Sequence, residues 1–518
     1  MTIFSTCDDK PKDECGVFGI YGPGLDVSRL TYFGLHALQH RGQESAGIAV
    51  AGEDGMRIRK RLGLVQTVFE ESDLRHLRGS MAVGHTRYST TGSTLPENAG
   101  PMSAESNVGT IVVAHNGNIV NASELRVELE EEGVRFATTT DTEVLTQLIA
   151  RSSGDTIVEM IQQAMTRCVG AFSLCILTER EIVGVRDLYG IRPLVYGTLD
   201  GGTVIASESC ALSTIGAELC RDVEPGEILV LSEDGSSSYR LEGTPGRAPC
   251  LFEFIYFARP DSKMGGGRVY MARQRMGEEL AAETWVDADV VIPVPDSAVP
   301  AAIGYARASG IPFSEGLIKN RYIGRTFIQP DQQMRELGAK LKYNALPEIV
   351  DGQRVILVDD SLVRATTSRL IVELLRSAGA REVHMRIHSP PIQHPCYLGV
   401  DMASHEELIA ARKTVKEIEA EIGADSLKYL SLDGLVRAVG HDRRSFCTGC
   451  LTGEYPVPVH GAKGKFGFER ADSESGPAGE REAVLANGVA LNNSSVLESR
   501  SDARRFVEIG RSGTGTGK

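Results

Sequence analysis

One stretch, residues 355–368, constrains the fold of this 518-residue chain more than any other. It opens with four apolar residues, which indicate a buried parallel strand. Two adjacent carboxylates, Asp359 and Asp360, follow, and a hydroxyl-rich loop leads into an apolar-periodic helix at 369–378. Loop amides and a helix N-terminus at the carboxyl end of a strand form a phosphate-binding geometry. The stretch therefore predicts a sugar phosphate site in an α/β sheet, where the carboxylates could bind ribose hydroxyls or Mg²⁺.

Composition excludes several classes of partner. The net charge of -14 argues against nucleic acid or an anionic membrane. No apolar run is long enough to span a bilayer, and residues 1–14 lack the apolar core of a signal peptide. We therefore expect a cytoplasmic protein. Its ten cysteines are then more typical of buried, catalytic or metal-bound thiols than of disulfides.

The first half of the chain contains a cysteine at the start of a predicted strand, residues 15–21. Cys15 alone indicates no more than a buried strand residue. Four later stretches place polar side chains at strand ends or before a helix, namely 35–48, 84–92, 115–119 and 138–143. The last of these precedes an apolar helix and has the residue types of an N-cap.

These pieces resemble the N-terminal-nucleophile (class II) glutamine amidotransferases, and residues 355–368 resemble the phosphoribosyl pyrophosphate (PRPP) motif of type I phosphoribosyltransferases. Together they resemble the glutamine PRPP amidotransferase family, in its propeptide-bearing, Fe–S-containing branch. The resemblance implies an α/β and α+β fold: an αββα sandwich followed by a domain with a mainly parallel sheet. The expected division is a propeptide at 1–14, a glutaminase domain at 15–245, a phosphoribosyltransferase domain at 246–460 and a disordered tail at 461–518.

The resemblance assigns roles in the glutaminase half. Cys15 is the expected nucleophile once cleavage after Glu14 has freed its α-amine, which would act as the general base. Asn116 and the Gly117 amide are the expected oxyanion hole. The expected glutamine-binding residues are Arg87 for the α-carboxylate, Asp141 for the α-ammonium, and Tyr88. His36, His40 and His85 are interpreted as structural.

The resemblance also assigns the transferase site. Residues 289–297 predict a strand and a turn for pyrophosphate, and 316–330 a cationic loop that closes over PRPP. One Mg²⁺ per subunit is expected, held by Ser297, Asp359 and Asp360. The expected PRPP-binding residues are Lys319, Tyr322, Arg325, Lys342, Asp359, Asp360, Ser361, Arg364, Ala365, Thr366 and Thr367.

One residue departs from the family pattern, which usually has glycine where this chain has Ala365. A methyl group there is harmless if the backbone φ is negative, and costs ~1 kcal/mol or more if φ is positive. The departure puts PRPP affinity in question.

Four cysteines of the second half predict a metal site. The two-residue spacing of Cys447 and Cys450 suits zinc, an Fe–S cluster or a redox pair. The contexts of Cys250 and Cys396 resemble the cluster-bearing branch, which implies one structural [4Fe–4S] cluster per subunit on all four. Residues 406–423 predict one amphipathic helix. The remaining cysteines of the glutaminase half are predicted to be small buried hydrophobic residues: Cys168, Cys175, Cys210 and Cys220.

The function expected from the resemblance joins the two halves. Glutamine, PRPP and water would give 5-phosphoribosylamine, glutamate and pyrophosphate, the first committed step of purine synthesis. Purine nucleotides are the expected inhibitors, and a homotetramer is the expected assembly. Two alternatives stay open: a related class II amidotransferase with another acceptor, and a non-catalytic sensor of PRPP or nucleotides, which Ala365 invites.

Overall fold

The computed structural model describes residues 14–53, 55–89, 92–320, 342–402, 404–440 and 443–459. All of them belong to one compact unit, Met1–Phe468. The predictions for residues 1–13, Tyr322, Arg325 and the tail at 461–518 lie outside the described residues. Within the described part, no helix is both long enough and apolar enough to cross a membrane.

The first half contains two antiparallel sheets. The seven-stranded sheet has the order β11-β9-β10-β1-β4-β2-β3, and the six-stranded sheet has the order β13-β12-β8-β7-β6-β5. The strands of the first sheet are β1 (Gly16–Tyr21), β2 (Ser45–Gly52), β3 (Gly55–Leu62), β4 (Met81–Arg87), β9 (Val195–Leu199), β10 (Gly202–Ala206) and β11 (Glu218–Asp222). Those of the second are β5 (Met102–Ser106), β6 (Gly109–Ile119), β7 (Gly170–Leu177), β8 (Ile182–Arg186), β12 (Glu227–Ser232) and β13 (Gly235–Arg240).

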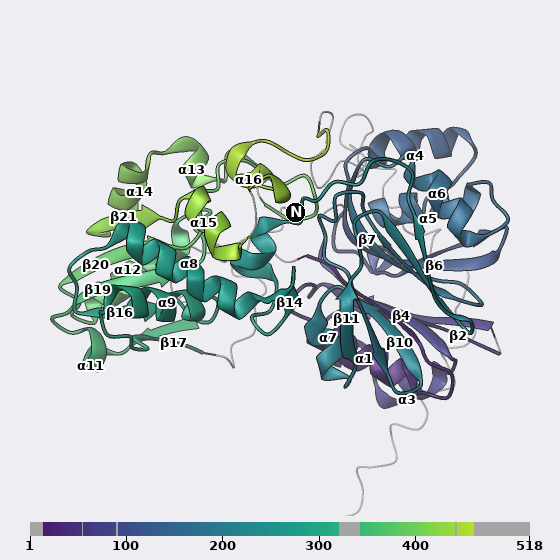
Figure 1. Ribbon diagram of the computed structural model, residues 1–518, viewed down its shortest axis with the longest axis horizontal. Coiled ribbons are helices and arrows are strands. Elements are labelled where there is room, and N and C mark those ends of the chain that lie inside the picture. The colour runs from purple at the N-terminus through teal and green to yellow at the C-terminus, as the bar shows by residue number, and fades with distance from the viewer. Residues whose placement is uncertain are drawn as a thin grey trace, which may run out of the picture. The chain divides into compact units, whose positions relative to one another are not determined.

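Helices cover the outer face of each sheet (Figure 1). The first sheet packs against α1 (Val27–Ala37), α2 (Val65–Val68), α3 (Glu71–His76) and α7 (Ser209–Thr214). The second packs against α4 (Ala122–Glu131), α5 (Asp141–Arg151) and α6 (Ile157–Met165). A third core lies between the sheets and takes Val17 and Val83 from one and Val112 and Leu229 from the other. This layering confirms the predicted αββα sandwich.

The second half is built on a four-stranded parallel sheet in the order β16-β19-β20-β21. Its strands are β16 (Val290–Pro293), β19 (Arg354–Asp359), β20 (Glu382–Ile387) and β21 (Ser426–Tyr429). One face packs against α8 (Val269–Thr284), α9 (Val299–Ser309) and α15 (Leu432–Val439), and the other against α12 (Thr366–Ser377) and α14 (Val415–Ile422).

Strand β19 shows why the sequence there is continuously apolar. Ile356 and Val358 belong to the core that contains α8 and α9, whereas Val355 and Leu357 belong to the core that contains α12. Both faces are buried, as in other parallel sheets with helices on each side. The predicted strand and the predicted helix after it are both confirmed.

Smaller elements complete the second half. Two short antiparallel pairs join β14 (Lys263–Met264) to β15 (Gly267–Arg268) and β17 (Leu317–Lys319) to β18 (Tyr343–Ala345). The remaining helices are a π-helix (Glu253–Phe257), α11 (Pro347–Val350), α13 (Ile409–Arg412), a 3₁₀ turn (Arg443–Ser445) and α16 (Gly449–Thr452). The first half has one further 3₁₀ turn, Pro96–Asn98.

Two expectations from the sequence are wrong. Residues 406–423 do not form one helix, because Thr414 and Glu417 make a capping box that starts α14 afresh after α13 has ended. Cys220 is exposed, because it lies at a register irregularity in the edge strand β11. Cys175 and Cys210 are buried as predicted, and Cys168 is half-buried.

Candidate active sites

The predicted nucleophile, Cys15, lies at the start of β1 with 7% of its surface exposed. Its Sγ donates a hydrogen bond to the Tyr88 carbonyl at 3.3 Å. Burial raises the pKa of this thiol to about 12, although Arg87 acts in the opposite direction. In the chain that still carries Glu14, the thiol is therefore protonated at neutral pH, and nucleophilic attack requires a base.

The predicted glutamine-binding residues converge on this thiol from separate elements. Arg87 ends β4, which pairs with β1 so that Thr86 lies opposite Gly16. Asp141 is the first residue of α5, whose N-cap is Thr140. The charges of Arg87 and Asp141 both act on the Cys15 thiol, the first lowering its pKa and the second raising it. The structure therefore brings together three residues separated by up to 126 positions in the sequence.

The predicted oxyanion donors lie near the end of β6. Asp141 is tied to this strand, because its Oδ2 accepts a hydrogen bond from the Ile119 amide at 3.2 Å. The Asn116 side chain is fully buried, yet neither its Nδ2 nor its Oδ1 has a hydrogen-bond partner among the described residues. An unsatisfied buried amide costs roughly 1–3 kcal/mol. The Asn116 amide is therefore available to a ligand oxygen, and it lies beside the residues expected to bind glutamine.

The predicted oxyanion glycine has no room for a side chain. Gly117 has a φ of +147°, and a Cβ built there would lie 2.0 Å from the Ala171 carbonyl oxygen. Among nearby histidines, burial lowers the pKa of His85 to about 3 and also lowers that of His115, near Asp141. Both are therefore neutral at pH 7. The structural interpretation of His36, His40 and His85 stays a prediction.

Sequence reasoning missed a buried ionic cluster beside Cys15, which we call the Arg41 cluster. Arg41 Nη2 lies 2.6 Å from Glu14 Oε2 and 2.6 Å from Glu253 Oε1, and its Nη1 lies 2.5 Å from Glu208 Oε1. Arg192 pairs with Glu14 and lies 3.8 Å from Glu253. All five side chains are at most 1% exposed. Glu253 belongs to the second half of the chain, so the cluster joins the two halves.

The Arg41 cluster also holds the nucleophile's backbone, since Arg41 Nε donates to the Cys15 carbonyl at 3.2 Å. Three carboxyl groups face two guanidinium groups. Burial raises the pKa of Glu14 to about 8 against the effect of Arg192, whereas His40 and Arg41 outweigh burial and hold the pKa of Glu208 well below its usual range. Of the three carboxyl groups, that of Glu14 is therefore the one that the two guanidinium groups do not keep ionised at pH 7. Arg41 stands in the stretch 35–48, but nothing in that stretch indicates partners more than 150 residues away.

The predicted Mg²⁺ ligands lie together in the second half. Ser297 Oγ donates to Asp360 Oδ2, Ser361 Oγ donates to Asp360 Oδ1 at 2.6 Å, and the Asp360 amide donates to Asp359 Oδ1 at 2.9 Å. Asp359 and Asp360 are both buried. Hydroxyl and carboxylate oxygens at the carboxyl ends of β16 and β19 are ligands that suit Mg²⁺, so the donor set fits this ion.

The structure shows the sign of φ at Ala365, on which the cost of its methyl group depends. The backbone φ of Ala365 is +66°. This residue is the N-cap of α12 and the one non-glycine residue with positive φ among the described residues. Ala365 is 2% exposed and lies in the core with Leu362 and Ile371. The loop therefore has the conformation that favours glycine, and part of the cost of the methyl group is offset by packing.

Replacing Ala365 with Gly is expected to relieve the left-handed strain. We expect the free energy of unfolding to rise by no more than about 1 kcal/mol, because glycine gives up the buried methyl contacts and adds chain entropy in the unfolded state. Urea denaturation measures this change. A fall of several kcal/mol would show that the methyl group is needed for packing.

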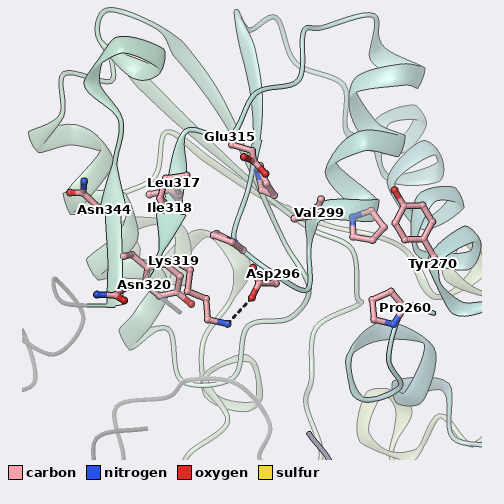
Figure 2. A pocket seen from close by; sticks show the side chains of 14 residues that line it. Pro260, Tyr270, Asp296, Val299, Glu315, Leu317, Ile318, Lys319, Asn320 and Asn344 are labelled. Atoms are coloured by element: carbon pink, nitrogen blue, oxygen red, sulfur yellow. Dashed lines mark hydrogen bonds and ion pairs between the residues drawn. The ribbon is translucent and has the colours of Figure 1, made fainter. Parts of the chain in front are cut away.

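A pocket of about 750 Å³ lies beside this site (Figure 2). It is lined by Asp296, Lys319, Asn320, Tyr343 and Asn344, among others, and Lys319 Nζ lies 3.1 Å from Asp296 Oδ2 across it. Asp359 and Asp360 do not line it, but Asp296 adjoins Ser297 in the turn after β16. Of the other predicted PRPP residues, Lys342 lies over the Tyr343 ring at 5.6 Å and Arg364 pairs with Glu407 at 3.2 Å. Thr366 is exposed and Thr367 is buried.

The four cysteines predicted to bind a cluster come together from three segments. Cys250 and Cys447 form an isolated parallel bridge, and the Cys450 carbonyl accepts hydrogen bonds from the amides of residues 393 and 394, just before Cys396. Burial raises the pKa of all four thiols, and Cys450 is affected by the other three. None is in a disulfide.

Four thiols, one buried and three half-buried, are a donor set that fits a thiolate-bound metal group. Within the described ranges, no three His, Cys, Asp or Glu side chains are placed around one point as ligands of a single metal ion. The identity of the bound group stays a prediction.

The fold and the sites define the chain as a glutamine-dependent glycosyltransferase, with a glutaminase half and a phosphoribosyltransferase half. Comparison with known families agrees: a glutamine amidotransferase domain matches residues 85–214, and a phosphoribosyl transferase domain matches residues 269–388. The predicted domain boundaries stay predictions.

Relatives define the family. The chain is 53% identical over 457 residues to an amidophosphoribosyltransferase of Synechocystis sp., covering 87% of this chain and 92% of that protein. It is 48% identical to the amidophosphoribosyltransferase of Bacillus subtilis, with 86% and 95% covered. The chain therefore belongs to the amidophosphoribosyltransferase family.

Solved structures agree with this assignment. One, described as the allosteric regulatory enzyme of purine biosynthesis, superposes with a TM-score of 0.84 at 46% identity and covers 89% of this chain and 100% of that chain. Another, the glutamine PRPP amidotransferase from B. subtilis in complex with ADP and GMP, has a TM-score of 0.82 at 47% identity and covers 86% and 98%. The predicted fold class is thereby confirmed.

Proposed function

We propose that this chain converts glutamine, PRPP and water into 5-phosphoribosylamine, glutamate and pyrophosphate, with Cys15 as the nucleophile of its first half. The observation that carries the proposal is that the buried Cys15 thiol donates to the carbonyl of Tyr88, next to Arg87, where the charges of Arg87 and Asp141 both act on it. A guanidinium and a carboxylate are complementary to the α-carboxylate and α-ammonium of an amino acid. The side-chain amide of a glutamine held in this way would face the thiol.

The glutaminase reaction needs a base, because burial keeps the Cys15 thiol protonated. Removal of residues 1–14 would supply one in the new α-amine, whose ordinary pKa is about 8. The amine takes the thiol proton and sulfur attacks the glutamine amide carbon. The C–N bond then breaks as the α-ammonium gives that proton to the leaving nitrogen, which departs as ammonia. Water then hydrolyses the thioester to glutamate. Asn116 and the Gly117 amide would stabilise the oxyanion of both tetrahedral intermediates.

The transferase reaction would take place at Asp359 and Asp360. Ammonia forms a bond to C1 of PRPP while the bond from C1 to pyrophosphate breaks. The two carboxylates, near the ribose, offset positive charge that develops at C1. Ser297, Asp359 and Asp360 would hold Mg²⁺, which would supply positive charge to neutralise the leaving pyrophosphate. Lys319 adds a cation near the same turn.

Cys250, Cys396, Cys447 and Cys450 are proposed to hold one [4Fe–4S] cluster per subunit. Its role would be structural, since neither reaction moves an electron. Four sulfur ligands suit iron–sulfur clusters and also zinc, so metal content decides between them.

Anaerobically purified protein is expected to contain about four iron atoms and four acid-labile sulfides per chain. Cys447→Ser should lower both, because it removes one ligand. Cys220→Ser is a matched control, since Cys220 is exposed on the edge of the first sheet. Zinc in place of iron, or iron content unchanged in Cys447→Ser, would contradict the cluster.

Regulation, assembly and location complete the proposal. Purine nucleotides are proposed as inhibitors, since the solved B. subtilis enzyme was complexed with ADP and GMP. The proposed assembly is a homotetramer. The proposed location is the cytoplasm, because free thiols, as all described cysteines are, suit a reducing compartment.

The decisive experiment measures glutamate release from glutamine by anaerobically purified protein, with and without Mg²⁺ and PRPP, together with pyrophosphate release. Stimulation by PRPP with equal amounts of both products supports the proposal. Glutamate release indifferent to PRPP would favour an amidotransferase with another acceptor. Release of neither product would favour a non-catalytic sensor. An active preparation whose intact mass retains residues 1–14 would refute the α-amine as base.

A further inference from the structure

The glutamine site receives contacts from a segment of the second half, residues 397–401, which we call the clamp. The Tyr397 carbonyl accepts a hydrogen bond from Asn118 Nδ2 at 2.9 Å. At the other end of the clamp, Asp401 Oδ2 accepts a hydrogen bond from Tyr88 Oη at 3.2 Å. Tyr88 is the residue whose carbonyl accepts from the Cys15 thiol. The clamp therefore contacts both the nucleophile's neighbour and the strand of the oxyanion donors.

The centre of the clamp lies directly against the oxyanion glycine. Gly399 has a φ of +109°, and a Cβ built there would lie 2.9 Å from both Cα and the carbonyl carbon of Gly117. Real Cβ atoms do not approach a backbone so closely, and a backbone cannot swing aside as a long side chain can. The absence of a side chain at Gly399 thus allows the Gly117 backbone to lie directly against the second half of the chain.

Hydrogen bonds fix the first residues of the clamp and the residues just before it. The Leu398 amide donates to Cys396 Sγ at 3.4 Å, and Tyr455 Oη donates to the Pro395 carbonyl at 2.5 Å. The amides of residues 393 and 394 both donate to the Cys450 carbonyl at 3.1 Å. The position of the clamp is thus fixed by the part of the second half where the four cysteines gather.

We propose that the clamp positions the oxyanion donors, so that the second half of the chain sets the rate of glutamine hydrolysis. This inference rests on the proposed role of Cys15 as nucleophile. Gly399 and Asn118 are positioning residues, because they act through Gly117 and touch no reacting atom. A misplacement of about 1 Å at a reacting centre can cost about 10²-fold in rate.

The test compares Gly399→Ala with Gly235→Ala in the full chain. Gly235 has a φ of +99° and nothing within 4 Å of a built Cβ, so it carries a similar left-handed strain without the contact. Gly399→Ala is expected to lower kcat for glutamine-dependent product formation about 10²-fold. The KM for glutamine should change little, because Arg87 and Asp141 remain. The rate with ammonia supplied directly should match that of Gly235→Ala.

A second variant covers the case in which Gly399→Ala does not fold. Asn118→Ala adds no atom and removes the hydrogen bond to Tyr397, and should lower the same kcat by about tenfold or less without changing the ammonia-dependent rate. An equal loss of both rates, or a change confined to the KM for glutamine, would overturn the inference. Unchanged kcat in both variants would overturn it too. A wild-type chain that releases no glutamate would instead refute the proposed function itself.

Discussion

Replacing Asn116 with Ala is expected to lower the glutamine-dependent rate about 10²–10³-fold, which is the usual cost of losing one oxyanion donor. The Asn116 amide is buried and has no hydrogen-bond partner among the described residues, so the substitution breaks no such bond in the resting protein. Thermal stability should therefore change little. The rate with added ammonia in place of glutamine should be retained, since that reaction bypasses the first half.

Asn121 provides the matched control for Asn116→Ala. It lies two residues after β6 and is fully engaged, with Nδ2 donating to the Arg167 carbonyl at 2.8 Å and Oδ1 accepting from the Val169 amide at 2.9 Å. Asn121→Ala should lower the free energy of unfolding by about 1–3 kcal/mol and leave the rate per folded molecule unchanged. If Asn116→Ala lost stability and both rates together, its amide would be structural and not an oxyanion donor.

The second large effect is expected at Arg41. Arg41→Met keeps the length of the side chain but removes the guanidinium that pairs most closely with the buried Glu208 and Glu253, and leaves Glu253 only the more distant Arg192. Breaking a buried pair from one side costs about 3–5 kcal/mol. Urea denaturation at pH 7 measures this loss. Arg437→Met is the control, because Arg437 also pairs with two carboxylates, Glu279 and Glu283, but is 54% exposed, so its loss should cost less than about 1 kcal/mol.

The contribution of Glu253 to the pH dependence of stability should change in Arg41→Met, when both chains have lost residues 1–14 and with them Glu14. In the wild-type chain, arginine outweighs burial and holds the pKa of Glu253 below its usual range, so the stability from this carboxylate is present above its unfolded pKa and lost as the pH falls. In the variant only the more distant Arg192 remains to oppose burial, so the pKa of this carboxyl rises relative to the wild-type chain. The stability lost in Arg41→Met should accordingly become smaller as the pH is lowered from about 8 to 5. A stability difference between the two chains that grows on acidification from pH 8 would contradict this account.

The sequence was sufficient where local patterns determine the structure. The apolar run before Asp359 predicts β19, and the hydroxyl-rich loop predicts the start of α12. The resemblance implied that Ser297 and Asp360 lie together, and the structure gives the reason: both follow strands that are parallel neighbours, and parallel strands end at the same edge of a sheet. Roles carried over by resemblance, such as that of Asn116, still await measurement.

The rest depends on tertiary contacts that no local pattern encodes. Whether Ala365 has positive φ depends on how the loop meets α12. Glu253 is an ordinary residue in an aromatic stretch until it meets Arg41, 212 residues earlier in the chain. Gly399 and Gly117 come from different halves, and each looks like a common loop or strand glycine in isolation. The start of α14 is different, since the Thr414–Glu417 capping box was available in the sequence and was missed.

The Arg41 cluster bears on how far the glutaminase half can be used as an exchangeable module. Arg41 comes from that half, but one of its carboxylate partners, Glu253, comes from the other. A chimera that fuses residues 15–245 to an unrelated acceptor enzyme would keep the pair between Arg41 and Glu208 but lose the buried pair with Glu253. An acceptor that presents a carboxylate at the equivalent point would restore this second pair. Recombination between such enzymes is thus constrained by charge pairing at the junction as well as by the length of the connecting peptide.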